Sequence, residues 1–453
     1  MKSYYGTLAV FLLMVLCCAG SGFAAEPGRE KLVLDLKECI GRAIAVAPEL
    51  GEAQADVELT ASKLEEAKSH RYPQIEILGL TGPIPQARGD QVSSPDKINQ
   101  TDRWTWFERG DATLIQPLYT FGKISESMKA AGHGIEVDLA KKEQRRNEVA
   151  LKVKEYYYGL LLARELKELV LEVQEDLAEA REKAVKLLDE GSPNVEELDI
   201  YKLDAFAGEV GKYLEEARKG EALALTALRS RLGLPPDAEL DIATERLLPG
   251  EEKVGELSAY LETAQSRRPE YRQIREGLRA RGALVEAARA AWYPDFFVAG
   301  YLSGANAEKR DKVVNPWVPD DYNHLWGGVA LGLKWRIDFG ITGAKVAGER
   351  AQYNRLLSTK EYAEANIPLQ IRKYYLDCRE AEKSAEKTRD GYSSAKKWAV
   401  AAIANFDFGI GPAKEIFDAL QQYAKMRAAY FQSIYNFKVA QANLAYATGG
   451  EPL

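Results

Sequence analysis

The sequence contains 453 residues, of which 28% are charged and 46% are hydrophobic, and its formal net charge is −7. A chain of this length can bury a large core in two or three domains. The acidic balance argues against nucleic acid as a partner, because proteins that bind nucleic acid usually present a basic face. With 4 cysteines and 3 histidines, neither a disulfide framework nor a histidine-rich metal site is expected, and no cofactor is predicted.

Residues 1–24 are predicted to be a secretory signal peptide. Lys2 supplies the positive charge, residues 8–19 are apolar, and the small residues Gly22 and Ala24 precede a cleavage site at Ala25. The apolar run is shorter than the roughly 20 residues of a membrane-spanning helix, and no later stretch reaches that length. The mature chain is therefore expected to be exported, as a soluble periplasmic protein, a secreted protein or an outer-membrane β-barrel.

The cysteines allow one alternative at the N-terminus. Cys17 and Cys18 could accept a lipid, although Leu16 stands where lipid attachment favours a small residue. Cys39 and Cys378 lie in strongly helical stretches and are predicted to be two unpaired, partly buried side chains.

The chain carries an internal duplication. Seven residues of the first half recur 221 positions later: Leu36, Ala43, Pro48, Glu49, Tyr72, Pro73 and Gly79 match Leu257, Ala264, Pro269, Glu270, Tyr293, Pro294 and Gly300. Seven more recur 218 positions later: Phe121, Gly122, Leu151, Tyr156, Tyr157, Ala163 and Gly191 match Phe339, Gly340, Leu369, Tyr374, Tyr375, Ala381 and Gly409. Two constant offsets predict a tandem repeat, with a first copy over 25–256 and a second over 257–453.

Both copies are expected to share one order of elements. The first is predicted to contain a helix over 36–71, strands over 74–80 and 104–121 around a loop at 82–103, a helix over 125–189, and a shorter helix over 194–232. The second is predicted to repeat this as a helix over 257–293, strands over 296–302 and 329–339, a helix over 344–408, and a last helix ending at Ala447. A further strand is expected over 239–243, between the copies.

The longest predicted helix carries two apolar seams. One is formed by Val153, Tyr156, Leu160, Ala163, Val170, Leu177, Ala184 and Leu188, and the other by Leu162, Leu166, Leu169, Val173, Ala180 and Leu187. Leu160 and Leu162 differ by about 200° around a helix of 3.6 residues per turn. A helix with neighbours on two sides would need this pattern, as in the wall of a helical cylinder; an ordinary antiparallel coiled coil with a third helix is the alternative.

The strands show the alternation of a membrane barrel with a wet interior. Leu331, Leu333, Trp335, Ile337 and Phe339 alternate with polar residues or glycine, and the first copy repeats the pattern around Trp104 and Trp106 with a phase slip near Pro117. Four tryptophans are predicted to lie in an aromatic girdle at the membrane surface: Trp104, Trp106, Trp326 and Trp335.

Four strands cannot close a barrel, since single-chain outer-membrane barrels have at least 8. Open sheet edges are not tolerated in lipid, so copies of the chain are expected to share one barrel. Two copies would give 8 strands and a filled interior, whereas three would give 12 strands and a passage.

Together, the signal peptide, the doubled helix-strand-loop-strand-helix order, and the junctions Tyr72-Pro73 and Trp292-Tyr293-Pro294 resemble the TolC-type outer-membrane efflux family. The resemblance covers nearly the whole mature chain. It implies a mainly α fold with a membrane β part: a homotrimer in which a 12-stranded barrel continues into an α-helical tunnel. It implies a passive exit duct in the outer membrane of a Gram-negative bacterium, working with a periplasmic adaptor protein and an inner-membrane pump in tripartite efflux or type I secretion.

In that family, adaptors dock on the turns that end the helical hairpins. The matching residues here are Gly191, Ser192, Pro193, Glu197 and Leu198 in the first copy and Gly409, Ile410, Gly411, Glu415 and Ile416 in the second. The two turns differ in sequence, so one docking sequence cannot serve both. Helix capping alone also accounts for these residues, because glycine ends helices and proline and acidic residues begin them.

The resemblance also implies a gate near the hairpin turns, held by charged and tyrosine contacts. Residues of the matching types are Asp189, Glu190, Arg389, Asp390, Tyr392 and Asp407, with Phe406 and Phe408 as a hydrophobic closure. The alternative is that the charges are simply solvated, as on most helix surfaces.

No catalytic residue is predicted. Asp338-Phe339-Gly340 matches a kinase triplet, but no glycine-rich or catalytic-loop motif accompanies it, and it is expected to end a barrel strand. The alternative functions are a periplasmic coiled-coil adaptor or structural protein and a secreted enzyme on a helical scaffold; the lack of an acid-base or metal constellation disfavours the enzyme.

Overall fold

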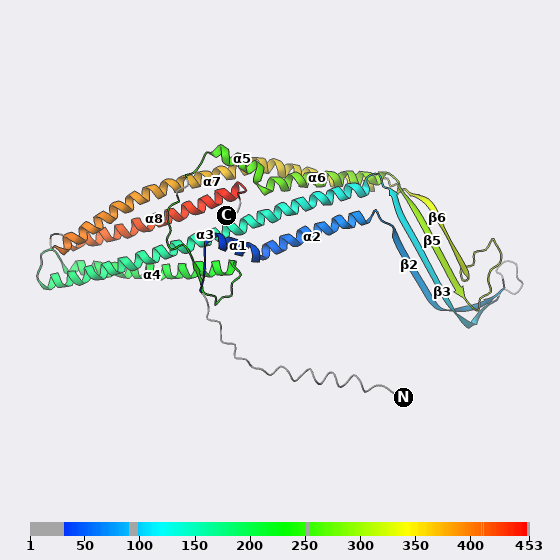
Figure 1. The fold of residues 1–453 in the computed structure, drawn as a ribbon, viewed down its shortest axis with the longest axis horizontal. Helices are drawn as coiled ribbons and strands as arrows, with labels where there is room; N and C mark the ends of the chain where they lie inside the picture. The colour runs from blue at the N-terminus through cyan, green and yellow to red at the C-terminus, as the bar shows by residue number, and fades with distance from the viewer. Residues whose placement is uncertain (1–30, 90–97, 251–252, 409, 411, 451–453) are drawn as a thin grey trace, which may run out of the picture. The chain divides into compact units, whose positions relative to one another are not determined.

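A computed structural model describes residues 31–89, 98–250, 253–408, 410 and 412–450, and these residues are mainly helical (Figure 1). The elements in chain order are β1 (Leu32–Leu34), α1 (Leu36–Val46), α2 (Pro48–Ser69), β2 (Gln74–Arg88), β3 (Ile98–Tyr119), α3 (Lys123–Asp189), α4 (Glu197–Arg231), β4 (Leu240–Ile242), α5 (Leu257–Arg267), α6 (Pro269–Arg289), the 3₁₀ turn η1 (Ala290–Trp292), β5 (Asp295–Ala307), β6 (His324–Lys334), α7 (Ile341–Asp407) and α8 (Ala413–Ala447). The predicted signal peptide lies outside the described residues.

Element boundaries recur at the offsets found in the sequence. α1 and α5 begin 221 residues apart, at Leu36 and Leu257, and so do β2 and β5. α3 and α7 each contain 67 residues, and both their first and their last residues are 218 positions apart. The boundaries of the two copies, 25–256 and 257–453, remain a prediction, because the compact units of the fold follow another division.

The fold has two compact units, each built from pieces of both copies. The helical unit contains residues up to Val46, Val153–Pro249 and Ala385–Tyr435, and the sheet unit contains Ala47–Lys152, Gly250–Ser384 and the residues from Asn436 onward. Helices α3, α7 and α8 run through both units. None of the described helices has the length and apolar composition needed to cross a bilayer.

Proline breaks the first helix of each copy, so the predicted helices over 36–71 and 257–293 are wrong as single helices. Pro48 and Pro269 are the first residues of α2 and α6. The preceding residues, Ala47 (ψ 118) and Arg268 (ψ 124), are extended, because the proline ring disfavours helical backbone in the residue before it. A proline at the first helical position lacks only an N–H that would have had no partner there.

The sheet unit contains one antiparallel four-stranded sheet in the order β2-β3-β5-β6 (Figure 1). β2 and β5 are longer than predicted, at 15 and 13 residues. Pro83 and Pro85 lie within β2, which proline tolerates because β2 is an edge strand. The phase slip predicted near Pro117 is confirmed, since the register of β3 against β5 shifts between Pro117 and Tyr119.

Strand β6 ends at Lys334, so the predicted strand end at Asp338-Phe339-Gly340 is wrong. Asp338 instead caps α7: its carboxylate accepts hydrogen bonds from the backbone N–H of Thr342 (2.8 Å) and from the Thr342 hydroxyl (2.6 Å). Aspartate favours this position because its side chain satisfies N–H groups that the first helical turn leaves free.

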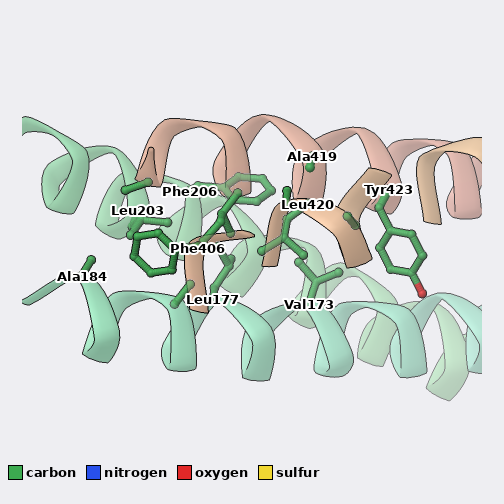
Figure 2. Packing of buried hydrophobic residues seen from close by; sticks show 14 of the residues in the cluster. Val173, Leu177, Ala184, Leu203, Phe206, Phe406, Ala419, Leu420 and Tyr423 are labelled. Carbon is green, nitrogen blue, oxygen red and sulfur yellow. The ribbon is translucent and has the colours of Figure 1, made fainter. Parts of the chain in front are cut away.

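The core of the helical unit lies between α3, α4, α7 and α8 (Figure 2). Leu177 of α3, Phe206 of α4, Phe406 of α7 and Leu420 of α8 meet there, each no more than 6% exposed. Alanines fill much of the remaining surface of α7 and α8, which allows the helices to approach one another closely. Burying each large side chain contributes about 1.5–3 kcal/mol relative to exposure.

The two predicted seams of α3 hold over only part of the helix. Leu160 and Leu162 are both buried, on nearly opposite sides. Beyond Leu169 the buried positions merge into one stripe about 80° wide, taking Leu169, Val173 and Ala180 from one seam and Leu177 and Ala184 from the other. The expectation of two opposite seams is therefore wrong for this stretch of the described helix.

The helical unit also contains a small parallel sheet of two strands, β1 and β4. β1 pairs with β4, which confirms the strand predicted over 239–243 and adds a partner that was not predicted. Asp241 of β4 accepts hydrogen bonds from Arg164 of α3 and forms an ion pair with Lys31 (both 2.6 Å). Burial works to raise the pKa of Asp241, but these cations outweigh it and lower the pKa to about 2.

Cys39 and Cys378 are both free, as predicted, and both are fully buried where partial burial was predicted. Cys39 belongs to α1 in the helical unit, and Cys378 packs in the core of the sheet unit against residues of α7 and α8. Burial raises the pKa of their thiols to about 12 and about 11, respectively.

Candidate functional site

The sheet has two chemically different faces. The register places Ile77, Trp106, Leu302 and Leu331 on one face, together with Ile75, Trp104, Leu325, Val329 and Leu333. All nine side chains are at least half exposed. We call this surface the apolar face. A polar row on this face, Thr81, Glu108 and Asn306, separates Trp104 and Trp106 from the other seven residues. An exposed apolar surface of this size is unusual on a protein in water and marks contact with lipid or with another protein.

The opposite face, which we call the mixed face, carries polar and aromatic groups. Ser303 hydrogen bonds with Asp111 (2.5 Å) and with His324 (2.8 Å), and Arg109 pairs with Asp111 (2.8 Å). Phe297 lies over Gly332, where an added Cβ would be 2.5 Å from its ring. Aromatic rings over glycines stabilise a sheet whose glycines have no side chain to pack.

The four tryptophans of the predicted girdle do not lie on one face. Trp104 and Trp106 belong to the apolar face, whereas Trp326 is opposite Ser303 on the mixed face. Trp335 follows the end of β6, and its indole N–H donates to the carbonyl of Trp292 (3.0 Å). The sequence alternation did not reveal the position of Trp326, because the prediction grouped the tryptophans by region and not by parity along the strand.

The turn from α3 to α4, which we call the first hairpin end, is built by helix capping. Gly191 has φ +75, the left-handed conformation that glycine adopts without strain. The N–H of Ser192 bonds to the carbonyl of Leu187 (2.9 Å), which closes a Schellman motif. Glu196 and Asp199 then form a reciprocal capping box at the start of α4.

The turn from α7 to α8, the second hairpin end, repeats this closure. The N–H of Ile410 bonds to the carbonyl of Asn405 (2.9 Å), and both residues are 218 positions after their counterparts in the first end. Gly409 and Gly411 lie outside the described residues. The N–H of Ala413 donates to the carbonyl of Asn194 (3.3 Å), so the two hairpin ends contact each other.

The predicted docking residues differ in accessibility between the two ends. Leu198 is 58% exposed, whereas its counterpart Ile416 is 3% exposed and packs in the core of the helical unit. Ile410 is 75% exposed, and Glu415 is also exposed. In the first end, Ser192 accepts a hydrogen bond from the N–H of Asn194 (3.4 Å), and Glu197 accepts one from the hydroxyl of Tyr201 (2.6 Å). Pro193 is exposed in the turn.

The predicted gate residues form two separate groups. Near the hairpin ends, Asp407 pairs with Lys183 of α3 (2.6 Å), Phe406 is buried and Phe408 is 80% exposed; Asp189 and Glu190 are exposed there as well. Arg389, Asp390 and Tyr392 lie at least 14 residues earlier on α7, about 21 Å or more along the helix. Arg389 and Asp390 are exposed, and the Tyr392 ring stacks on Tyr430 of α8 at 5.6 Å.

Comparisons with known proteins agree with this geometry. The profile of the outer membrane efflux protein family matches residues 260–450. The matched segment contains 191 of the 453 residues, so the sequence similarity to that family is shown for this part of the chain.

Solved structures resemble this chain over nearly its whole length. The outer-membrane channel OprN covers 94% of this chain and 94% of its own, with a TM-score of 0.76 and 17% identity. The outer membrane protein VceC of Vibrio cholerae covers 92% of this chain and 97% of its own (TM-score 0.74, 15% identity). The CmeC outer membrane channel of Campylobacter jejuni covers 92% and 85% (TM-score 0.75, 16% identity). At these identities the likeness shows the fold. No protein of curated function matches the sequence closely.

No sequence pattern indicates the polar tie that links α3 to α8. The Glu172 carboxylate accepts hydrogen bonds from the Tyr423 hydroxyl (2.7 Å) and from Arg427. Burial works to raise the pKa of Glu172, but these hydrogen bonds outweigh it and lower the pKa. Burial, together with the bond to Glu172, raises the pKa of Tyr423. The tie was missed because its partners are about 250 residues apart and no local pattern relates them.

Proposed function

We propose that this protein is the exit duct of a tripartite efflux or type I secretion system. Three copies form a 12-stranded barrel in the outer membrane of a Gram-negative bacterium, and their helices form a periplasmic tunnel. The duct conducts its cargo passively, and an inner-membrane pump with its periplasmic adaptor supplies the energy. No residue acts as a catalyst in this proposal.

The observation that carries the proposal is a two-faced sheet with free edges. The sheet contains four strands, and β2 and β6 have no partner strand on their outer sides among the described residues. Its apolar face exposes Leu325, Val329 and Leu331 to about 80% each. In lipid, such a face is stable but free edges are not, since each unpaired backbone group costs several kcal/mol. Pairing β6 of one copy with β2 of the next satisfies the unpaired backbone groups of both edges.

The mixed face then lines the interior. Arg109, Asp111 and Lys334 are charged groups that water in the lumen can solvate, whereas lipid could not. With three copies the barrel has 12 strands, wide enough to leave a passage, whereas 8 strands would leave an interior filled by side chains.

Electron microscopy and bilayer recording of the detergent-extracted protein test this assembly. We expect hollow, elongated trimers that resist dissociation by detergent at room temperature, and stepwise ion conductance after reconstitution. Compact monomers without conductance would exclude the duct. Fractionation separates the alternative of a periplasmic coiled-coil adaptor, which would be recovered as a soluble protein without heat-modifiable trimers.

Adaptor docking at the hairpin ends is the part of the proposal that substitutions can test. Leu198 and Ile410 are the exposed aliphatic side chains of the two ends. Glu197, next to Leu198, and Glu415, in the first turn of α8, are exposed as well. We expect Leu198→Asp to weaken complementation of efflux in a strain that carries the cognate pump, with trimer yield unchanged. Leu223→Asp is the matched control, because Leu223 is equally exposed on α4 (65%) but 25 positions beyond Leu198. Equal loss with both variants would argue against docking at the end.

The gate residues that lie near the hairpin ends act at the same place as the docking residues. Lys183 and Asp407 tie α3 to α7, and opening requires the helix pairs to separate there. Phe408 and the exposed acids Asp189 and Glu190 would surround the entrance. We expect Lys183→Ala to raise single-channel conductance, and Lys212→Ala, which removes another exposed lysine of the helical unit, to leave it unchanged.

A further inference from the structure

The loop between β5 and β6, residues 308–323, folds back across the sheet. Its parent strands occupy one side of the sheet, yet the loop contacts the two strands of the other side. The N–H of Lys309 donates to the Thr105 hydroxyl of β3 (3.3 Å), and the N–H of Asp311 donates to the carbonyl of Ala87 in β2 (3.1 Å). Thr105 is on the mixed face and only 8% exposed, so the loop covers the mixed face.

Arg310 anchors the loop. Its guanidinium donates to the carbonyl of Pro85 (2.7 Å) and lies 3.9 Å from the centroid of the Tyr322 ring. Tyr322 in turn meets Phe107 edge-on at 5.6 Å, and Phe107 is another mixed-face residue. Asn323 closes the base of the loop, because its amide bonds both the N–H of Ala307 (2.9 Å) and the carbonyl of Arg310 (3.1 Å). A loop held by this many contacts has one defined position.

The apex of the loop, residues 313–319, is uncharged, and four of its seven residues are exposed while the other three are half-buried. Its sequence is Val-Val-Asn-Pro-Trp-Val-Pro. Asp320 fixes it by accepting a hydrogen bond from the N–H of Val313 (2.9 Å). Val314 is 85% and Trp317 is 90% exposed. A rigid apolar apex in water is costly unless it meets an apolar partner, and lipid cannot be that partner because the apolar face is on the other side of the sheet.

We propose that the apices of three copies meet around the channel axis and form an apolar constriction at this end of the duct. The inference rests on the proposed function. A ring closed by pairing β6 with the next β2 uses a head-to-tail interface, so rotation about the axis repeats every loop at the same height. With the mixed face inward, each apex points into the lumen, and its partner is the same apex of the neighbouring copies. A narrow apolar ring opposes ion passage because water leaves it readily.

Cysteine cross-linking tests whether the apices meet. Trp317→Cys adds an exposed thiol to a described chain whose own thiols, Cys39 and Cys378, are 0% and 1% exposed. We expect oxidation of the detergent-extracted trimer to give disulfide-linked dimers on a non-reducing gel. Trp104→Cys is the matched control: it replaces the same residue type on the apolar face (58% exposed) and should give no cross-link.

Bilayer recording tests whether the apices restrict flow. Single-channel conductance should rise about twofold or more in the double variant Val314→Ala with Trp317→Ala, and stay unchanged in Trp104→Ala. The constriction is refuted, and the duct stands, if trimers conduct but the thiols do not cross-link. The same holds if the thiols cross-link but the double variant has the conductance of the wild type. If the wild-type protein forms neither trimers nor channels, both the duct and the constriction fail.

Discussion

The tie between Glu172 and Arg427 should respond asymmetrically to removal of its two partners. Arg427 is the buried member, with 12% of its side chain exposed, whereas Glu172 is 46% exposed. Glu172→Ala leaves a buried guanidinium without its carboxylate. Arg427→Met removes the charge, keeps an apolar side chain of similar length, and leaves a carboxylate that can turn to water while still accepting from Tyr423.

The magnitude follows from burial. Breaking a fully buried ion pair costs about 3–5 kcal/mol, and the half-exposed carboxylate reduces this to about 2 kcal/mol for Glu172→Ala. Arg427→Met should cost less than about 1 kcal/mol, because replacing a buried charge by a well-packed apolar group is often neutral. The double variant should be less stable than Arg427→Met by at most a few tenths of a kcal/mol, because it no longer contains the uncompensated charge.

Hydrogen exchange followed by mass spectrometry measures this loss of stability in the helices that carry the tie. Peptides covering 165–180 of α3 and 416–432 of α8 should exchange about 30-fold faster in Glu172→Ala and less than about fivefold faster in Arg427→Met, at 1.36 kcal/mol per factor of ten. Peptides of the four-stranded sheet should not change in either variant. Equally faster exchange in the two single variants would refute the reasoning. It would mean that loss of the hydrogen bonds, and not the unpaired buried charge, determines the loss of stability.

Three further predictions concern the cores. Asp241→Asn should cost about 2 kcal/mol at neutral pH, because the native pKa of about 2 lies below the ordinary aspartate value of 3.8. The wild-type contribution is complete above pH 3.8 and is lost as pH falls through 2, so the denaturation midpoint of the variant should change less than that of the wild type between pH 4 and 2. Phe406→Ala should accelerate exchange in the helical-unit core in line with a cost of about 3–5 kcal/mol, whereas Phe408→Ala, at an 80% exposed site, should stay within about 0.5 kcal/mol of wild type. Cys39 and Cys378, with pKa values raised to about 12 and about 11, should react with a disulfide reagent at pH 8 only after unfolding; rapid reaction of the folded protein would contradict their burial.

Much of the fold could be predicted because it is encoded locally and encoded twice. The 67-residue helices α3 and α7 were predicted to within three residues at each end, since long periodic segments bounded by glycine and proline leave little choice. The breaks at Pro48 and Pro269 were missed, although proline at the first position of a helix is itself a start signal. The apolar residues keep the same helical spacing on both sides of each proline, so their periodicity does not reveal that the helix is broken there.

The candidate sites were harder to predict because they depend on which residues meet in space. Leu198 and Ile416 occupy equivalent positions in the sequence, yet one is exposed and the other is buried. The difference arises because α8 begins at Ala413, 216 residues after α4 begins at Glu197, whereas the glycines of the two turns are 218 apart. A two-residue difference rotates the equivalent side chains by about 200° around a helix, and no pattern within one copy could reveal that.

The prolines of β2 indicate how much of the free edge is available to a neighbouring copy. Pro83 and Pro85 have no N–H to donate, so a further strand can pair with β2 only from Gln74 to Gly82. β6, the other edge, has 11 residues. Both lengths fit a tilted strand crossing a bilayer, which needs about 9–11 residues. The rest of β2, where Pro85 and Ala87 hold the β5–β6 loop, would then lie beyond the hydrocarbon region. In the proposed duct, a loop anchored there would lie outside the lipid, in water and beside the same loop of another copy.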